Sequence, residues 1–198
     1  VSFFDACEKN DIKAIIGTEF YVCDDLRVKS GKTKLNHLVL LCKNETGYKN
    51  ISLLNAIAFR DGYYYKPRID LNLLLSLTPT DTIITTACVA GRMFKDGWEE
   101  KFLIPVKNHF NGNFFLEVQA HLTKAQAIIN KKIIELSKKY NIEIIAGTDS
   151  HYIYSEDAWK RDYLQKSSGI FMEEESGWFK DYPDGQTLFN RFKRQGVL

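Results

Sequence analysis

The chain has 198 residues, of which 44% are hydrophobic and 26% are charged, and its formal net charge is +2. This length suits one sizeable α/β domain or two small ones, and the near-neutral charge argues neither for nor against a nucleic-acid partner. No apolar stretch approaches the ~20 residues that a membrane-spanning helix needs, and no signal-peptide pattern occurs, so we expect a cytoplasmic protein.

The cysteines follow no spacing that is typical of disulfide frameworks. Cys7, Cys23, Cys42 and Cys88 include no C-x-x-C pair, and three of them lie in apolar runs. This usage is typical of reduced, intracellular thiols.

Strand-like and helix-like segments alternate along the chain. Residues 1–7 have helical apolar spacing, and we expect that the chain begins inside a helix of a longer protein. Strands are predicted at 13–16, 20–23, 37–42, 82–86, 113–119 and 143–146, and helices at 47–59, 71–77, 98–110, 123–140 and 186–194. Pro105 should interrupt its helix, and Thr123 should cap the next one. Unbroken apolar strands alternating with helices predict a parallel sheet covered by helices, either a barrel or a doubly wound sheet. No G-x-G-x-x-G follows the first strand, which argues against dinucleotide binding.

The most informative stretch is 143–152, where a short apolar run is followed by Asp149 and His151. In an α/β barrel, functional groups gather at the C-terminal ends of the strands. A carboxylate and an imidazole at positions i and i+2 of an extended segment point to the same side and can share one metal ion. The alternative is a loop aspartate that caps the next helix beside a solvent-exposed histidine.

Two other predicted strands also end in polar groups, because Glu19 follows the strand 13–16 and Cys88 follows the strand 82–86. If these strands are parallel neighbours, Glu19, Cys88, Asp149 and His151 meet at one rim. Mixed oxygen, nitrogen and sulfur ligands suit zinc, and a carboxylate-rich cluster would also accept manganese or iron. The alternatives are a surface glutamate and a small buried cysteine. His37 starts its strand, so strand direction alone does not place it at this rim.

Six segments resemble, in the same order, the PHP domain (polymerase and histidinol phosphatase) of bacterial DNA polymerase III alpha subunits. They are residues 16–22, 37–50, 64–70, 87–91, 115–119 and 147–152. The resemblance covers most of residues 10–155. It implies an α/β fold, a distorted (β/α)7 PHP barrel that is incomplete at its N-terminal end.

The resemblance also implies a cluster of up to three metal ions, zinc or manganese, held by Glu19, His37, Cys88, Asp149 and His151. Such metals activate a water molecule and hydrolyse phosphoesters, which in complete polymerase members implies 3′–5′ exonuclease proofreading.

Three further residues are candidates for contacts around this cluster. Lys66 and Arg68 are candidates for phosphate or DNA binding, and the alternative is a basic pair in a turn held by Pro67. His121 follows another predicted strand and is a candidate for a contact with a ligand residue or with the substrate.

The chain departs from the family at two points. It lacks the opening H-x-H motif and a later D-H pair, so by analogy the cluster lacks roughly half of its ligands. Residues 159–166 match the family less well, which indicates a divergent, phage-borne or plasmid-borne member.

We therefore expect residues 1–157 to be a PHP domain, and residues 158–198 to be its end and the connection toward a polymerase palm. The parent would be the catalytic alpha subunit of DNA polymerase III, a nucleotidyltransferase of DNA replication. It would use magnesium, DNA, dNTPs and other replisome subunits, and no membrane. Two alternatives remain. The first is a catalytically silent module that braces the polymerase or docks a proofreading subunit. The second is a stand-alone phosphatase of the histidinol-phosphate type.

Overall fold

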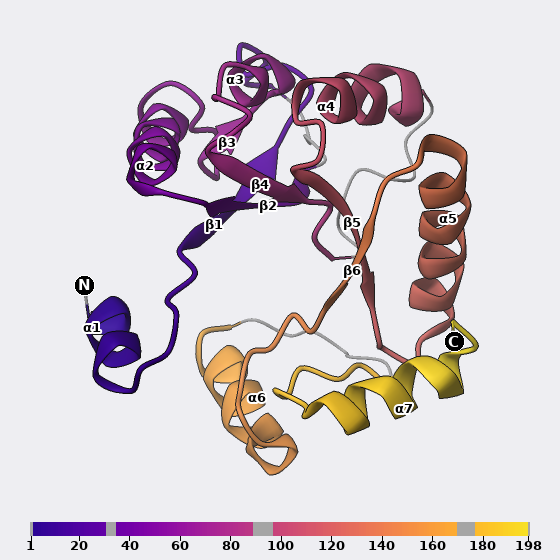
Figure 1. The fold of residues 1–198 in the computed structure, drawn as a ribbon. Helices are drawn as coiled ribbons and strands as arrows, with labels where there is room; N and C mark the ends of the chain where they lie inside the picture. Colours follow the sequence, from indigo (N-terminus) through magenta and orange to yellow (C-terminus); the bar gives the residue numbers. More distant parts are fainter. Residues whose placement is uncertain (1, 31–34, 89–96, 170–176, 198) are drawn as a thin grey trace. The chain divides into compact units, whose positions relative to one another are not determined.

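The computed structural model of the chain describes residues 2–30, 35–88, 97–169 and 177–197 (Figure 1). The chain divides into two compact units, of which the first contains residues 1–86 and 90–115 and the second contains residues 87–89 and 116–198. The predicted mixed α/β class is confirmed. A seven-stranded barrel is not confirmed, since the described residues form six strands.

The first unit contains a mixed sheet in the order β3-β1-β2-β4, and the start of β5 (Phe114–Gln119) pairs with β4. The strands are β1 (Gly17–Val22), β2 (Asn36–Cys42), β3 (Arg68–Ile69) and β4 (Thr82–Thr85). β2 runs antiparallel to both β1 and β4, so the prediction of a wholly parallel sheet is wrong. A parallel pair needs a long crossover, usually a helix, and the described part of the β1–β2 connection contains none.

Alternation along β1 and β2 separates a core face from a half-exposed face. Phe20 and Val22 of β1, and Leu38 and Leu40 of β2, are all 3% exposed or less. Helix α2 (Glu45–Arg60) contributes Ile51, Leu54 and Ala58 to the buried residues at helical spacing. The opposite face carries Glu19 and Tyr21 of β1 and His37 of β2 beside apolar residues of β2, and it stays partly open to solvent.

Capping residues explain where two helices of the first unit begin. The Asn44 side chain accepts a hydrogen bond from the backbone N–H of Gly47 at 2.8 Å, and this starts α2 two residues before the predicted position. Asp70 caps α3 (Leu71–Leu75) by accepting from the N–H of Leu73 at 3.0 Å.

The remaining elements of the first unit follow the predictions in part. α1 (Ser2–Lys9) forms as expected, whereas residues 13–16 form no strand. A π-helical turn, η1 (Glu99–Leu103), leads directly into α4 (Ile104–His109). The change of helix type falls beside Pro105, which has no backbone N–H with which to continue the hydrogen bonding of the preceding helical turn.

The second unit is built on a strand–helix–strand element. β5 and β6 (Ile144–Gly147) are parallel, with Leu116 opposite Ile144, and α5 (Lys124–Tyr140) connects them (Figure 1). Thr123 caps α5 as predicted, since its hydroxyl accepts from the N–H of Gln126 at 3.2 Å. Ile129, Ile133 and Leu136 form the buried stripe of this helix.

The C-terminal part of the second unit contains a 3-10 turn (Ser155–Asp157), α6 (Ala158–Ser167) and α7 (Gly185–Gln195). α6 was not predicted, because it buries no residue and its sequence has no apolar stripe. α7 is attached to the end of β5 through Gln195, whose amide donates to the backbone oxygens of His121 at 2.6 Å and Gln119 at 3.1 Å.

The four cysteines form no disulfide. Among the described residues, no helix combines the length and the apolar character that crossing a membrane requires.

Candidate functional site

The first unit brings Glu19 and His37 together on the half-exposed face of the sheet. In the antiparallel register Glu19 lies opposite Val39 and Tyr21 lies opposite His37, so Glu19 and His37 are diagonal neighbours. Their side chains meet with 2.5 Å between Nδ1 of His37 and Oε1 of Glu19, and they are 28% and 46% exposed. A carboxylate and an imidazole therefore share one surface that water and ions can reach.

Antiparallel pairing explains why His37 reaches this position although it lies near the start of its strand. Because β2 runs opposite to β1, the start of β2 lies beside the end of β1. The objection that strand direction keeps His37 away from Glu19 held only for parallel neighbours. The pairing of β1 with β2 was the missing information.

An aromatic ring and a cation flank the Glu19–His37 pair. The Tyr21 ring meets the His37 ring edge-on, with 5.2 Å between their centroids. The ammonium of Lys66 lies 5.8 Å from the centroid of the same Tyr21 ring, and Lys66 is exposed. Lys66 is thus a cation near the pair that a phosphate in solution could reach.

Arg68 occupies a different environment from Lys66. Its side chain is fully buried, and its guanidinium donates to the backbone oxygens of Gly62, Val28 and Leu26 at 2.8, 3.1 and 3.2 Å. The guanidinium also lies over the Tyr64 ring at 5.2 Å. In this structure Arg68 joins the segment 26–28 to Gly62 and does not face solvent, so a phosphate would have to displace these carbonyls to reach it.

In the second unit, β6 ends at Gly147 and delivers Asp149 and His151 into the following loop. A Cβ on Gly147 would collide with the Glu117 side chain on β5, so any other residue here would require Glu117 to move. Asp149 has a left-handed backbone with φ of +49°, so the loop is not the extended segment that was predicted. Asp149 and His151 are held near each other by a local contact.

That contact selects one tautomer of the His151 ring. Nδ1 of His151 lies 2.7 Å from the backbone oxygen of Asp149. A carbonyl oxygen only accepts hydrogen bonds, so Nδ1 carries the proton and the neutral ring keeps its lone pair on Nε2. Metal-binding histidines usually have this arrangement, in which the second ring nitrogen donates to a carbonyl or carboxylate.

The segment 177–182 is hydrogen-bonded to the loop that carries Asp149 and His151, a feature that the sequence did not predict. The backbone oxygen of Lys180 accepts from the N–H of His151 at 2.7 Å and of Tyr152 at 3.3 Å. Ser150 donates from its hydroxyl to the backbone oxygen of Asp181 at 2.8 Å. The sequence predicted only a connection in this region, because no short-range pattern marks such long-range pairing.

An ion pair joins the segment 177–182 to α7. Arg191 donates two hydrogen bonds to the carboxylate of Asp181, at 2.8 and 2.7 Å, and both side chains are nearly buried. These hydrogen bonds lower the pKa of Asp181 below its ordinary value. Arg191 also lies over the Phe179 ring, 4.1 Å from its centroid.

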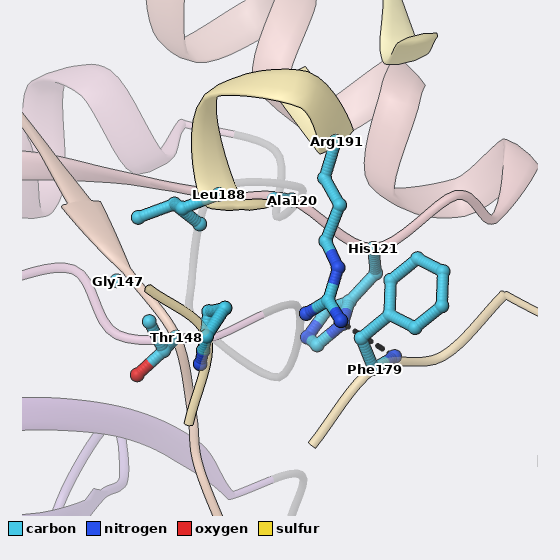
Figure 2. Close-up of a pocket in the computed structure, with 8 residues that line it drawn as sticks. Ala120, His121, Gly147, Thr148, Phe179, Leu188 and Arg191 are labelled. Atoms are coloured by element: carbon cyan, nitrogen blue, oxygen red, sulfur yellow. Dashed lines mark hydrogen bonds between the residues drawn. The ribbon is translucent and has the colours of Figure 1, made fainter. Parts of the chain in front are cut away.

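His121 supports the same segment from β5. It is 2% exposed, stacks on Trp178 with 4.9 Å between ring centroids, and its Nδ1 accepts from the N–H of Phe179 at 3.1 Å. Figure 2 shows His121, Phe179 and Arg191 on one side of a small pocket and Thr148 opposite. His121 thus packs against the segment that carries Lys180.

Cys88 follows β4 by three residues and is a half-buried thiol. It belongs to the second unit with Asp149 and His151, whereas Glu19 and His37 belong to the first. Residues 89–91, the rest of the segment 87–91, lie outside the described residues. The structure therefore describes two carboxylate–imidazole pairs, each within its own unit.

Comparisons with known proteins match the chain to one family. A family model described as "PHP domain" matches residues 1–121. The chain is 34% identical over 176 residues to the DNA polymerase III subunit alpha of Borreliella burgdorferi, an alignment that covers 83% of this chain and 15% of that protein. It is 33% identical to the subunits of Chlamydia trachomatis and Aquifex aeolicus, with 79% and 82% of this chain and 15% of each relative covered. The chain thus spans about 15% of the length of these relatives.

Proposed function

The chain belongs to the PHP domain family, and we propose that it is part of a DNA polymerase III alpha subunit in which it acts as a metal-dependent phosphoesterase. Its relatives of that name share about a third of the aligned residues, and the family match covers more than half of the chain. In this proposal residues 1–157 form most of a distorted (β/α)7 barrel, and residues 158–198 lead from it toward a polymerase palm.

We assign metal binding to Glu19, His37, Cys88, Asp149 and His151. Two carboxylates, two imidazoles and a thiol form a donor set that suits zinc, and the carboxylates also suit manganese. The contact between Glu19 and His37, and the free lone pair on Nε2 of His151, support this assignment from each unit separately.

A bound metal ion would lower the pKa of a coordinated water and polarise a phosphoester oxygen. The chain's own residues would do the rest. Glu19 and His37 would offer an accessible oxygen and nitrogen to the metal. The hydrogen bond from Nδ1 of His151 to the backbone oxygen of Asp149 would keep the His151 ring in the tautomer that can bind metal. Lys66 would supply a cation for a phosphate. Lys66 carries the phosphate contact in this proposal, because Arg68 is buried.

The observation that carries the proposal is the Glu19–His37 pair on an accessible sheet face of a PHP family member. For the parent subunit we propose 3′–5′ exonuclease proofreading beside DNA synthesis. The parent would use DNA, dNTPs, magnesium and other replisome subunits in the cytoplasm.

The test is hydrolysis of a 5′-labelled oligonucleotide by the parent subunit with added Mn²⁺ or Zn²⁺. Wild type should shorten the strand from its 3′ end, and Glu19→Gln should lose this activity. Glu45→Gln is the matched control, because Glu45 is an exposed glutamate of the same unit that pairs only with Lys49 among the described residues. Equal activity of the wild type and Glu19→Gln would overturn the proposed site. Turnover of a small phosphomonoester without any effect on DNA would instead favour a phosphatase.

A second candidate function is a silent module that braces the polymerase or docks a proofreading subunit. One observation favours it, namely that two of the four histidines make structural contacts. Nε2 of His109 lies 2.9 Å from the backbone oxygen of Leu77, and His121 is buried against Trp178. Binding of a proofreading subunit by a protein without nuclease activity would support this function over the first.

A further inference from the structure

Lys180 contacts both candidate ligands of the loop that follows β6, and it does so through two different groups. Its ammonium lies 3.5 Å from Oδ2 of Asp149. Its backbone oxygen accepts from the N–H of His151 at 2.7 Å. One residue, 29 positions after His151 in the sequence, thus holds the residues on either side of Ser150.

The ammonium of Lys180 is nearly buried, which makes its partner important. The Lys180 side chain is 10% exposed, and it lies near the Trp178 ring at 5.5 Å. A buried ammonium without a partner is strongly destabilising, because it loses its hydration without compensation. Asp149 is the carboxylate with which the described residues pair it, and the Asp149 side chain is itself only 23% exposed.

The contact involves one oxygen of the Asp149 carboxylate and leaves the other for a metal ion. Carboxylates that bind metals are themselves held by hydrogen bonds, which fix their orientation. Asp149 also has a left-handed backbone, and a residue other than glycine keeps this conformation only when its surroundings hold it there. The ammonium and the backbone oxygen of Lys180 supply such a restraint on both sides of Ser150.

We propose that Lys180 is a positioning residue for the metal site: it orients the carboxylate of Asp149 and the backbone of His151 so that both side chains can bind the same cation. The inference rests on the proposed function, because it assumes that Asp149 and His151 are ligands. It adds a residue that lies outside the motifs of the family resemblance.

The position of Lys180 is in turn fixed by its neighbours in the segment 177–182. Asp181 is held by Arg191, and Phe179 is held by His121 and by the guanidinium of Arg191 (Figure 2). Contacts on either side of Lys180 therefore restrain the backbone from which its side chain extends, as a positioning role requires.

The test is the affinity of this chain for Mn²⁺, measured by calorimetry for the wild type and for Lys180→Met. Methionine keeps the backbone oxygen and most of the side-chain volume, so the variant removes the ammonium alone. We expect about 10- to 100-fold weaker binding, the usual effect of removing a group that orients a metal ligand. Lys131→Met, at an exposed lysine of the same unit, should bind as the wild type does.

Two further variants separate positioning from general destabilisation. Lys180→Arg keeps a cation, so it should bind Mn²⁺ more tightly than Lys180→Met and less tightly than the wild type. If Lys180→Met fails to fold, Lys180→Arg is compared with the wild type in its place. In an Asp149→Asn background, Lys180→Met should cause little additional loss, because the carboxylate that it orients is already absent.

Three outcomes decide the inference. Unchanged or tighter Mn²⁺ binding by Lys180→Met, with the wild type binding normally, would overturn the role of Lys180 and leave the proposed function intact. A wild-type chain that binds neither Mn²⁺ nor Zn²⁺ would overturn the inference, which needs Asp149 and His151 to bind a cation in this chain, whereas the nuclease test on the parent subunit decides the proposed function. Weaker binding by Lys180→Met that persists in the Asp149→Asn background would show an effect that does not pass through Asp149, and would also overturn the inference.

Discussion

The two carboxylate–imidazole pairs are held in place by different kinds of structure. Glu19 and His37 lie on paired strands, so the backbone register alone makes them neighbours. Asp149 and His151 lie in a loop whose shape depends on the segment 177–182 and on α7. We therefore expect the positions of Glu19 and His37 to be insensitive to substitutions outside their strands. The positions of Asp149 and His151 should change when residues that are distant in the sequence are substituted.

The largest expected loss of stability comes from removing the Asp181–Arg191 ion pair, which supports the loop of Asp149 and His151. Arg191→Met leaves the nearly buried carboxylate of Asp181 without its cation, which should reduce the free energy of unfolding by about 3 kcal/mol. Hydrogen exchange should quicken in residues 148–153 and stay unchanged in β1 and β2.

Arg194→Met is the control, since Arg194 lies on the same helix, is exposed and forms no ion pair with the described residues. Equal losses from the two substitutions would show that the loop does not depend on the Asp181–Arg191 pair.

Acid should also destabilise the loop of Asp149 and His151, because it protonates Asp181 and weakens the ion pair with Arg191. Arg191 lowers the pKa of Asp181 in the folded chain below the ordinary value of 3.8. A carboxyl group with a lowered pKa stabilises the fold above the unfolded pKa, and this stabilisation is lost as the pH falls through the folded pKa. We therefore expect the second unit to lose stability below about pH 4.

The measurement is urea unfolding between pH 3 and pH 6, with Arg191→Met for comparison. This variant should show a smaller change over the same range, because the pKa of Asp181 is no longer lowered. An identical pH dependence in both proteins would assign the effect to other carboxyl groups.

A smaller effect is expected from Ser150, which lies between the two candidate ligands. Ser150→Ala removes the hydrogen bond to the backbone oxygen of Asp181 and should cost about 1 kcal/mol. Ser167→Ala, which removes a bond within the exposed α6, should cost less. A larger loss from Ser167→Ala would contradict the view that Ser150 joins two segments.

The smallest effect on stability is expected at the first pair. His37→Gln breaks a half-exposed contact, so the free energy of unfolding should change by no more than about 1 kcal/mol. The same substitution should strongly weaken Mn²⁺ binding. Parallel losses of stability and binding would mean that His37 holds the sheet together and is not a ligand.

Long periodic segments were predictable from the sequence, whereas the pairing between them was not. α5 and its Thr123 cap, and the strands β2, β4, β5 and β6, lie within a few residues of their predicted bounds. β3 has two residues and α6 has no buried face, so neither leaves a periodic pattern to detect. The antiparallel direction of β2 could not be read from its apolar run, because such a run fits either direction.

The candidate site was predictable in its residue types and not in its geometry. The Asp149–His151 spacing was visible in the sequence, whereas the contact of Glu19 with His37 required the register of β1 against β2. Arg68 was a candidate phosphate contact because arginine can bind phosphate in bidentate fashion, yet its side chain is buried and donates to three backbone oxygens. Lys180 was missed because its contacts cross a stretch without any short-range pattern.

The central claim is that these residues bind metal, and calorimetric titration of this chain with Mn²⁺ and Zn²⁺ tests it most directly. The titration compares the wild type with His37→Gln and Asp149→Asn. The account predicts that the wild type binds metal and that each substitution weakens binding at least about tenfold with little change in stability. Metal binding that is equal in all three proteins, or absent in the wild type, would contradict it.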